Sequence, residues 1–428
     1  MKRNKTRTSY QKTNDVEIVR MDLILDSGDR ISMKDMYITV DFYQDIFGGM
    51  PLQCEMVVSD GLDLYGVLPI KNNEILDIEF YTPGCDSVSK QLRLYSRDEV
   101  VLKDSGTSST YKLCFVSPET LINVNKKVSR SYTGTLSNIC GAIWSESFPG
   151  SDPIKLESSE DKQTLVLPYA TPFDHINFLS KRALRKDGNE CNFLFFEDFN
   201  GFSFVSLGNM FEQPSRKDAF YKYGSNPDTN QLAPTDLLAK RYMIQDVDIL
   251  GNENYIDQIQ QGIYSGFVQN YNISTKTING YDYSYNKAFD AISTLNEFPI
   301  TNNAISSSVG FLSNYQVYNG KFYPGSKIQR MSQINSFLNS RVRFVVSGNS
   351  SLNIGDKITV QFEKPKALPG SNFVDKYRSG FYLVSSIKHT LSKVDGYTMT
   401  VEACTDSYAA QIPDESRFET EVQKGELR

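Results

Sequence analysis

The chain has few of the residues from which metal centres and acid–base relays are usually built. Among 428 residues there are only two histidines and one tryptophan, and no Cys-x-x-Cys pair links the six cysteines: Cys54, Cys85, Cys114, Cys140, Cys191 and Cys404. Structural zinc and iron–sulfur sites need closely spaced thiolates, and a small secreted disulfide scaffold would be shorter and denser in cysteine. We therefore expect reduced thiols in a protein assembled in the cytosol, without a metal or cofactor.

The sequence also lacks long apolar runs and an excess of basic over acidic residues. No run approaches the roughly 20 apolar residues that span a bilayer, so we expect no membrane contact. The net charge of −6 gives no overall attraction to nucleic acid. We therefore expect that any DNA contacting this protein would move through a passage and would not be bound in a groove. Residues 1–14 hold five Lys or Arg residues without the apolar stretch that a signal peptide needs. We expect a disordered basic tail there; an arm that touches another subunit or DNA is the alternative.

Tyrosine and phenylalanine are plentiful, at 25 and 26 residues. Both fit the pleated, half-buried surfaces of β sheets, and large rings are useful in extensive protein interfaces. The length exceeds one ordinary core, so three or four domains are expected.

Residues 15–116 show the alternation of a half-buried β sheet. Apolar residues alternate with charged ones along 19–26, and Ser27-Gly28-Asp29 then turns the chain. Further strand-like runs follow, most of them separated by Gly, Pro, Asn or Asp: 37–42, 52–58, 75–81, 92–95 and 111–116. Short strands at this spacing predict a first small β barrel, closed or nearly closed.

Residues 117–210 combine helix and strand signals and predict an α+β domain. One helix begins at Thr135 and carries a buried stripe: Leu136, Ile139, Cys140, Ile143 and Trp144. A sharper start signal, Thr171-Pro172-Phe173-Asp174, precedes a second helix that Gly188 is expected to end. Its predicted stripe is Phe173, Ile176, Leu179 and Ala183. Asn200-Gly201 between two aromatic runs predicts a hairpin.

Residues 211–340 combine a polar stretch, a weakly periodic stretch and a helix signal, and a second β block follows them. We expect a polar linker over 211–235, an irregular insertion with some strands over 260–325, and a helix over 326–340. Strands then recur at 357–363, 381–387 and 397–403, which predicts a second barrel at 341–408 before a charged tail, 409–428. The fold class is α+β, mainly β, with two small antiparallel barrels and α+β domains inserted between them.

No local pattern predicts catalysis. Neither His175 nor His389 has a nucleophile and an acid beside it in sequence. Glu197 and Asp198 are neighbours on a strand and point to opposite faces, so they cannot flank one glycosidic bond; we interpret them as turn residues. Gly48-Gly49 shows no phosphate-loop pattern, and the Lys/Arg cluster at 181–186 is interpreted as the solvated end of a helix. We predict no catalytic, cofactor-binding or metal-binding residue, and no enzyme.

Five segments, in their order, resemble the tail-hub superfamily: 117–139, 167–183, 192–204, 348–358 and 379–389. The first contains Ser129-x-x-Tyr132-x-Gly134-x-x-x-x-Ile139 at the entry to a helix, and the fourth contains Leu352-Asn353-Ile354-Gly355-Asp356 at the entry to a barrel. Together they resemble the baseplate hub protein of T-even-type contractile-tailed phages and, more distantly, VgrG spike and late-control tail proteins. Residues 211–325 are not matched.

The resemblance implies a specific architecture and set of partners. Hubs of this family are trimeric rings with pseudo-six-fold symmetry, built from two barrels per chain. They join the hexameric tail tube, or a tube initiator, to a trimeric central spike that often carries a lysozyme, and baseplate wedge proteins surround them. DNA passes through the ring in transit. The implied location is the tail baseplate of the virion, assembled in the host cytoplasm.

Three other functions are alternatives to the hub. A VgrG-like component of another contractile injection or secretion apparatus is the nearest, but such proteins normally continue into a β-helical needle of repeated short strands. A tail-associated cell-wall hydrolase would need a convergent acid–base site. A receptor-binding tip would show repeats or a long fibrous segment.

Overall fold

A computed structural model describes residues 13–47, 51–61, 72–103, 108–160, 162–186, 190–224, 241–251, 254–272, 275–300, 311–317, 324–364 and 374–410. The remaining residues include nearly all of the predicted basic tail, most of the predicted charged tail, Gly48-Gly49 and Gly188. Predictions about those residues lie outside the described part of the chain.

The first β block forms where the alternating sequence predicts it. Its strands follow the order β3-β4-β7-β6-β5-β1-β2, with every neighbouring pair antiparallel. Gly28 adopts a φ of +89° in the turn that joins β1 to β2, a conformation that favours glycine. The bounds are β1 Glu17–Ile24, β2 Arg30–Ser32, β3 Tyr37–Asp45, β4 Gln53–Asp60, β5 Ile75–Tyr81, β6 Val88–Lys103 and β7 Ser108–Val116.

The second β block contains three strands that the sequence analysis did not predict. These are β13 (Phe220–Tyr223), in the supposed linker, β14 (Asp246–Ile249), and β19 (Ser340–Ser347). They join the predicted β20 (Lys357–Phe362), β21 (Gly380–Ser392) and β22 (Gly396–Thr405) in the order β14-β19-β22-β21-β20-β13. A single parallel bridge between Lys222 and Met243 also links β13 to the residues that lead into β14.

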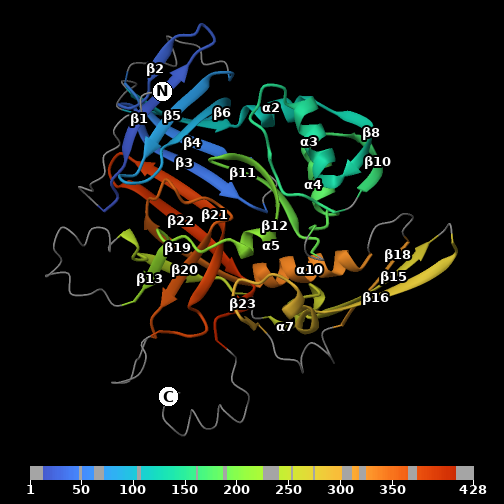
Figure 1. Cartoon of the computed structure of the whole chain (residues 1–428). Helices are drawn as coiled ribbons and strands as arrows, with labels where there is room; N and C mark the ends of the chain where they lie inside the picture. The colour runs from blue at the N-terminus through green and yellow to red at the C-terminus, as the bar shows by residue number, and fades with distance from the viewer. Residues whose placement is uncertain are drawn as a thin grey trace.

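The two blocks are joined into one 13-stranded sheet (Figure 1). Strand β21 makes the joint: residues 380–383 pair with β20, and residues 386–392 pair with β3. A register shift between Val384 and Ser386 separates the two halves. One hydrophobic core runs beneath both blocks, from Met21 in β1 to Cys404 in β22. The mainly β fold is thus confirmed, while the ladders of the described strands close neither block into a separate barrel.

The α+β module packs on the side of this sheet around a core of its own. Both predicted helices form, and Thr171 and Asp174 make a reciprocal capping box. The second helix ends at Ser180, earlier than predicted, because Lys181 already caps it. The bounds are α2 Pro118–Asn125, β8 Val128–Thr135, α3 Leu136–Ser147, β9 Lys155–Leu156, β10 Lys162–Ala170, α4 Pro172–Ser180, β11 Phe193–Asp198 and β12 Gly201–Ser206.

The hairpin β11–β12 belongs to both cores. Alternate side chains of β11 point to opposite sides, so Phe193 and Phe195 enter the core of the α+β module, whereas Leu194 and Phe196 enter the core of the β blocks. The hairpin therefore holds the module against the sheet.

Most of the remaining segments lie next to the α+β module, below it in the view of Figure 1. Strands β15, β16 and β18 form a separate sheet that projects from the body, and the long helix α10 packs against its base (Figure 1). The bounds are α5 Leu207–Glu212, α7 Tyr255–Gln260, β15 Ser265–Asn272, β16 Thr277–Ser284, α8 Tyr285–Ala288, η3 Phe289–Ala291, β17 Phe298–Pro299, β18 Phe311–Val317, α10 Pro324–Asn339 and β23 Ser407–Tyr408.

Candidate functional site

The most extended functional feature is the outward face of the joined sheet. Alternate residues of β3, β4, β7, β19, β21 and β22 fill the core, so the residues between them face outward. The outward residues are largely polar and include four basic and four acidic side chains: Lys112, Arg341, Arg343 and Lys388, and Asp41, Asp45, Glu55 and Glu402. This polar face continues without a break across both β blocks.

Ion pairs tie neighbouring strands together on this face. Lys388 Nζ lies 3.2 Å from Asp41 across the β21–β3 joint, and Thr390 Oγ1 donates to the same carboxylate at 2.7 Å. Arg341 and Arg343 both contact Glu402 from the neighbouring strand, at 3.2 and 3.1 Å. Partly exposed cross-strand pairs of this kind contribute about 0.2–1 kcal/mol each.

Their charges are therefore largely satisfied within the chain. Partial burial alone would lower the pKa of Lys388, but Asp41 and Tyr43 raise it above the usual lysine value. The Lys388 amine therefore stays charged and paired with Asp41 at the joint.

A shallow hollow of about 480 Å³ lies over the joint. Tyr43 and Asp45 of β3, Lys388 of β21, and Arg343 of β19 are among the residues that line it. Because cations and carboxylates alternate along its walls, the hollow suits contact with another macromolecule better than acid–base chemistry on a small substrate.

The two histidines lie apart from this face. His175 is buried in α4, and its Nε2 lies 2.8 Å from the carbonyl oxygen of Pro168. His389 is fully buried in β21, where its Nδ1 lies 2.7 Å from the hydroxyl of Tyr397. Burial lowers the pKa of His389 to about 3, so the ring is neutral at physiological pH.

Glu197 corrects one of the sequence interpretations. Asp198 is a turn residue as predicted, since its carboxylate accepts from Asn200 N at 2.6 Å, but Glu197 is buried and points away from the turn. Its carboxylate accepts from Leu52 N at 2.9 Å and from Ser117 Oγ at 2.6 Å.

Burial raises the pKa of Glu197 to about 7, although Lys90, 3.8 Å away, and both hydrogen bonds oppose the shift. A carboxyl group with such a pKa could act as an acid. The geometry here instead makes a joint between the first β block, the start of α2, and β11.

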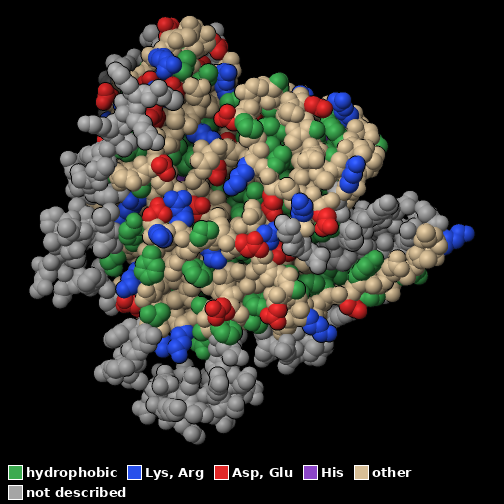
Figure 2. Space-filling model, in the orientation of Figure 1, with side chains coloured by type: hydrophobic (Ala, Val, Ile, Leu, Met, Phe, Trp, Pro, Cys, Tyr) green, Lys and Arg blue, Asp and Glu red, His purple; other side chains and the backbone are tan. Residues whose placement is uncertain are grey.

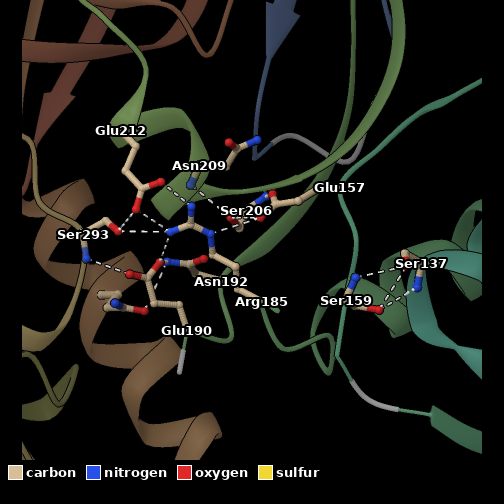
Figure 3. A network of polar contacts seen from close by, with 11 residues as sticks. Ser137, Glu157, Ser159, Arg185, Glu190, Asn192, Ser206, Asn209, Glu212 and Ser293 are labelled. Carbon is tan, nitrogen blue, oxygen red and sulfur yellow. Dashed lines mark hydrogen bonds and ion pairs between the residues drawn. The ribbon is translucent and has the colours of Figure 1, made fainter. Parts of the chain in front are cut away.

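Arg185 corrects a second interpretation, because it is not part of a solvated helix end (Figure 3). Its guanidinium lies 3.2 Å from Glu157 and 3.9 Å from Glu190, and it binds both oxygens of Glu212. It also donates to Ser293 at 3.1 Å. The hydrogen bonds from Arg185, together with one that Ser293 donates to Glu212 at 2.8 Å, lower the pKa of Glu212 to about 2. The network connects the α+β module to α5 and to the segment before β17.

No local signal in the sequence could have revealed this network, because most of its members are separated by tens of residues. The outward face of the sheet, in contrast, follows from the period-two alternation of its strands. Within the described residues, no group of three His, Cys, Asp or Glu side chains is placed to hold a metal ion. No disulfide joins any of the six cysteines, all of which lie in the described ranges.

Comparison with known proteins gives a consistent picture. No protein-family model matches the chain. The sequence is 20% identical over 375 residues to the probable baseplate hub protein gp334 of Vibrio phage KVP40, covering 81% of this chain and 85% of that protein.

Two solved structures share the fold. The 43 kDa tail protein of prophage MuSo2 from Shewanella oneidensis superposes with a TM-score of 0.56 at 11% identity, over 92% of this chain and all of that one. A tail protein from Neisseria meningitidis gives 0.53 at 10% identity, over 90% and 96%. The resemblance predicted from the sequence is thereby confirmed. None of the helices in the described ranges is long and apolar enough to cross a membrane.

Proposed function

We propose that this chain, similar in sequence to a phage baseplate hub protein and folded like phage tail proteins, is the structural hub at the centre of a contractile tail baseplate. The observation that carries the proposal is the joint between β3 and β21, which merges two β blocks into one sheet with a continuous polar face. An enzyme needs a convergent site, whereas an adaptor needs extended repeated surfaces, and this sheet is such a surface.

The proposed assembly is a homotrimeric ring in which two β blocks per chain present six similar surfaces. A six-fold tail tube can dock evenly on a three-fold spike only through an adaptor of this kind. The proposed neighbours are the tail tube protein or its initiator on one side and the central spike, with its lysozyme, on the other. Baseplate wedge proteins surround the ring, which is assembled in the host cytoplasm and resides in the virion.

The outward face of the joined sheet is proposed to line the channel through which DNA passes. DNA binding depends mainly on neutralising phosphates with Lys and Arg. On this face the four basic side chains are balanced by four acidic ones, and Lys388, Arg341 and Arg343 are already paired. A surface of this kind would form a hydrated channel wall that has little net electrostatic attraction for the phosphates of DNA.

Mass measurement and electron microscopy of the purified protein test the proposal. We expect a species of three chain masses, alone or with the spike bound, and rings of tail-tube width in negative stain. A stable dimer, or a chain that stays monomeric with the spike present, would contradict it.

Absence of catalysis is a separate expectation of the hub proposal. The purified chain should not hydrolyse peptidoglycan or polysaccharide, because the structure of the described residues offers no convergent acid–base pair. Turnover that disappears in Glu197→Gln would show that the buried carboxyl group is catalytic after all.

A further inference from the structure

The two β blocks carry opposite net charge. Residues 15–116 contain 18 acidic and 9 basic side chains, a net charge of −9. Residues 341–408 contain 6 acidic and 9 basic side chains, a net charge of +3. A chain of net charge −6 is therefore strongly polarised along its length, and such polarity orients how copies of one protein meet.

The acidic charge is concentrated in the strands of the first block that lie farthest from the joint in the order of the sheet. Residues 17–35 and 72–81, which hold β1, β2 and β5, contain eight carboxylates and three cations. Two of those cations are used internally: Arg20 binds Asp77 at 3.0 Å, and Arg30 binds Asp77 at 3.2 Å. Exposed carboxylates remain at this end, among them Asp26 and Asp29. We call this surface the acidic end.

The opposite end of the molecule is basic and aromatic. It consists of β13, β20 and the start of β21 with the turn before it, and its exposed cations include Lys376 and Arg378. Four rings lie exposed among them: Phe220 at 43%, Tyr223 at 41%, and Tyr377 and Phe381 at 39% each.

The strand register places two of these rings, Phe220 and Phe381, on one surface. Phe220 of β13 pairs with Thr359 of β20, and Thr359 pairs with Phe381 of β21, so the two rings flank one residue on the same face. Aromatic rings and Arg side chains are enriched where proteins bind each other. We call this surface the basic–aromatic end.

The two ends cannot meet within one chain. In Figure 1 the acidic end, with β1 and β2, lies at the top, and the basic–aromatic end, with β13 and β20, lies at the lower left. Figure 2, in the same view, shows Asp and Glu side chains over the upper end with some Lys and Arg among them, and side chains of both signs along the lower edge. A surface that complements a distant surface on the same molecule makes head-to-tail contacts between copies.

We propose that the basic–aromatic end of one copy binds the acidic end of the next copy. This inference rests on the proposed trimeric hub, and it adds which surfaces join neighbouring chains in the ring. Each contact between chains then joins a second block to a first block, just as β3–β21 does within a chain, so the two kinds of block alternate around the ring. Contacts between two first blocks are disfavoured by their shared negative charge.

Charge reversal at each end provides the test. Asp26→Lys with Asp29→Lys makes the acidic end basic, and Lys376→Glu with Arg378→Glu makes the other end acidic. Each pair should weaken self-association, measured by sedimentation at low ionic strength, by about tenfold or more. A chain that carries all four substitutions should associate like wild type again, because the charges are complementary once more. Raising the salt concentration should weaken wild-type assembly.

Lys127→Glu with Lys162→Glu is the matched control, since both residues are exposed on the α+β module, away from both ends. This variant should associate like wild type, and circular dichroism should show that every variant is folded. If wild type assembles but the reversals have no effect, or if the four-fold variant does not recover, the charge pairing is wrong and the hub proposal stands. If wild type does not assemble even with its spike, the hub proposal itself fails.

Discussion

At the scale of single residues, Glu197 shows how burial changes what a carboxyl group does. It lies in a joint between three segments, with its oxygens bound to Leu52 N and Ser117 Oγ. The joint needs a hydrogen-bond acceptor, but burial disfavours the charge, so the pKa rises to about 7. The role of this residue is therefore set by its surroundings and not by its neighbour Asp198.

This shift predicts a pH dependence of stability. A carboxyl group whose pKa is higher in the folded state binds an extra proton there, so its contribution falls as the pH rises from about 4.5 to about 7 and is constant above. Glu197→Gln removes the titration and should gain stability relative to wild type over that range, by about 2–3 kcal/mol. Urea unfolding at pH 5 and pH 8 measures this. The exposed Asp26→Asn should show no such gain, and an equal response of the two variants would contradict the assignment.

At the scale of the element, α4 separates the contribution of packing from that of capping. Leu179 is fully buried in the core of the α+β module, whereas Asp174 is exposed in the first turn, where it accepts from Thr171 Oγ1 at 2.7 Å. A carboxylate in the first turn interacts favourably with the helix dipole, and the reciprocal capping box of Thr171 and Asp174 adds hydrogen bonds to that effect.

Two substitutions in α4 should therefore differ in cost. Leu179→Ala should lower the free energy of unfolding by about 2–5 kcal/mol, because it leaves a cavity. Asp174→Ala should lower it by about 1 kcal/mol, because water can replace part of the cap. Chemical denaturation of both variants checks this, and equal losses would mean that α4 does not pack as described.

At the scale of the whole molecule, separate segments are held together by polar networks as well as by apolar cores. Arg185 connects Glu157 of the α+β module to Glu212 of α5 and to Ser293. Asn296 makes a similar connection farther along, since its amide donates to Phe381 O and to Thr405 Oγ1, both at 3.0 Å. Contacts of this kind specify how segments that are distant in the sequence sit against one another and against the sheet.

Removing Arg185 should therefore destabilise the whole molecule. Arg185→Met leaves Glu157 and Glu190 without their cation and should cost about 3–5 kcal/mol, the usual penalty when one partner of a largely buried ion pair is lost. Arg130→Met breaks a pair of similar geometry with Glu146, at 3.0 Å, that is exposed on both sides; it should cost about 1 kcal/mol or less. Thermal melts compare the two, and equal shifts would show that the Arg185 network adds nothing.

Local features of this protein were determined by the sequence alone. The strands of the first block, the start of α4 at Thr171, and the hairpin at Asn200-Gly201 depend on side-chain alternation, capping and turn chemistry within a few residues. The strands β13 and β14 were missed because four-residue strands in a polar setting have too little alternation to be distinguished from a loop.

Only the tertiary structure decided how these elements combine. Asp41 pairs with Thr390 across the β3–β21 joint, and the two residues are nearly 350 positions apart in the chain. Likewise, Arg185 meets Glu157, Glu212 and Ser293 only after the module has folded onto its neighbours. Period-two alternation states which side of a strand is buried, but any strand of matching pattern could lie beside it. The choice of neighbour comes from packing a single core under both blocks, and that choice also creates the continuous polar face proposed to line the channel.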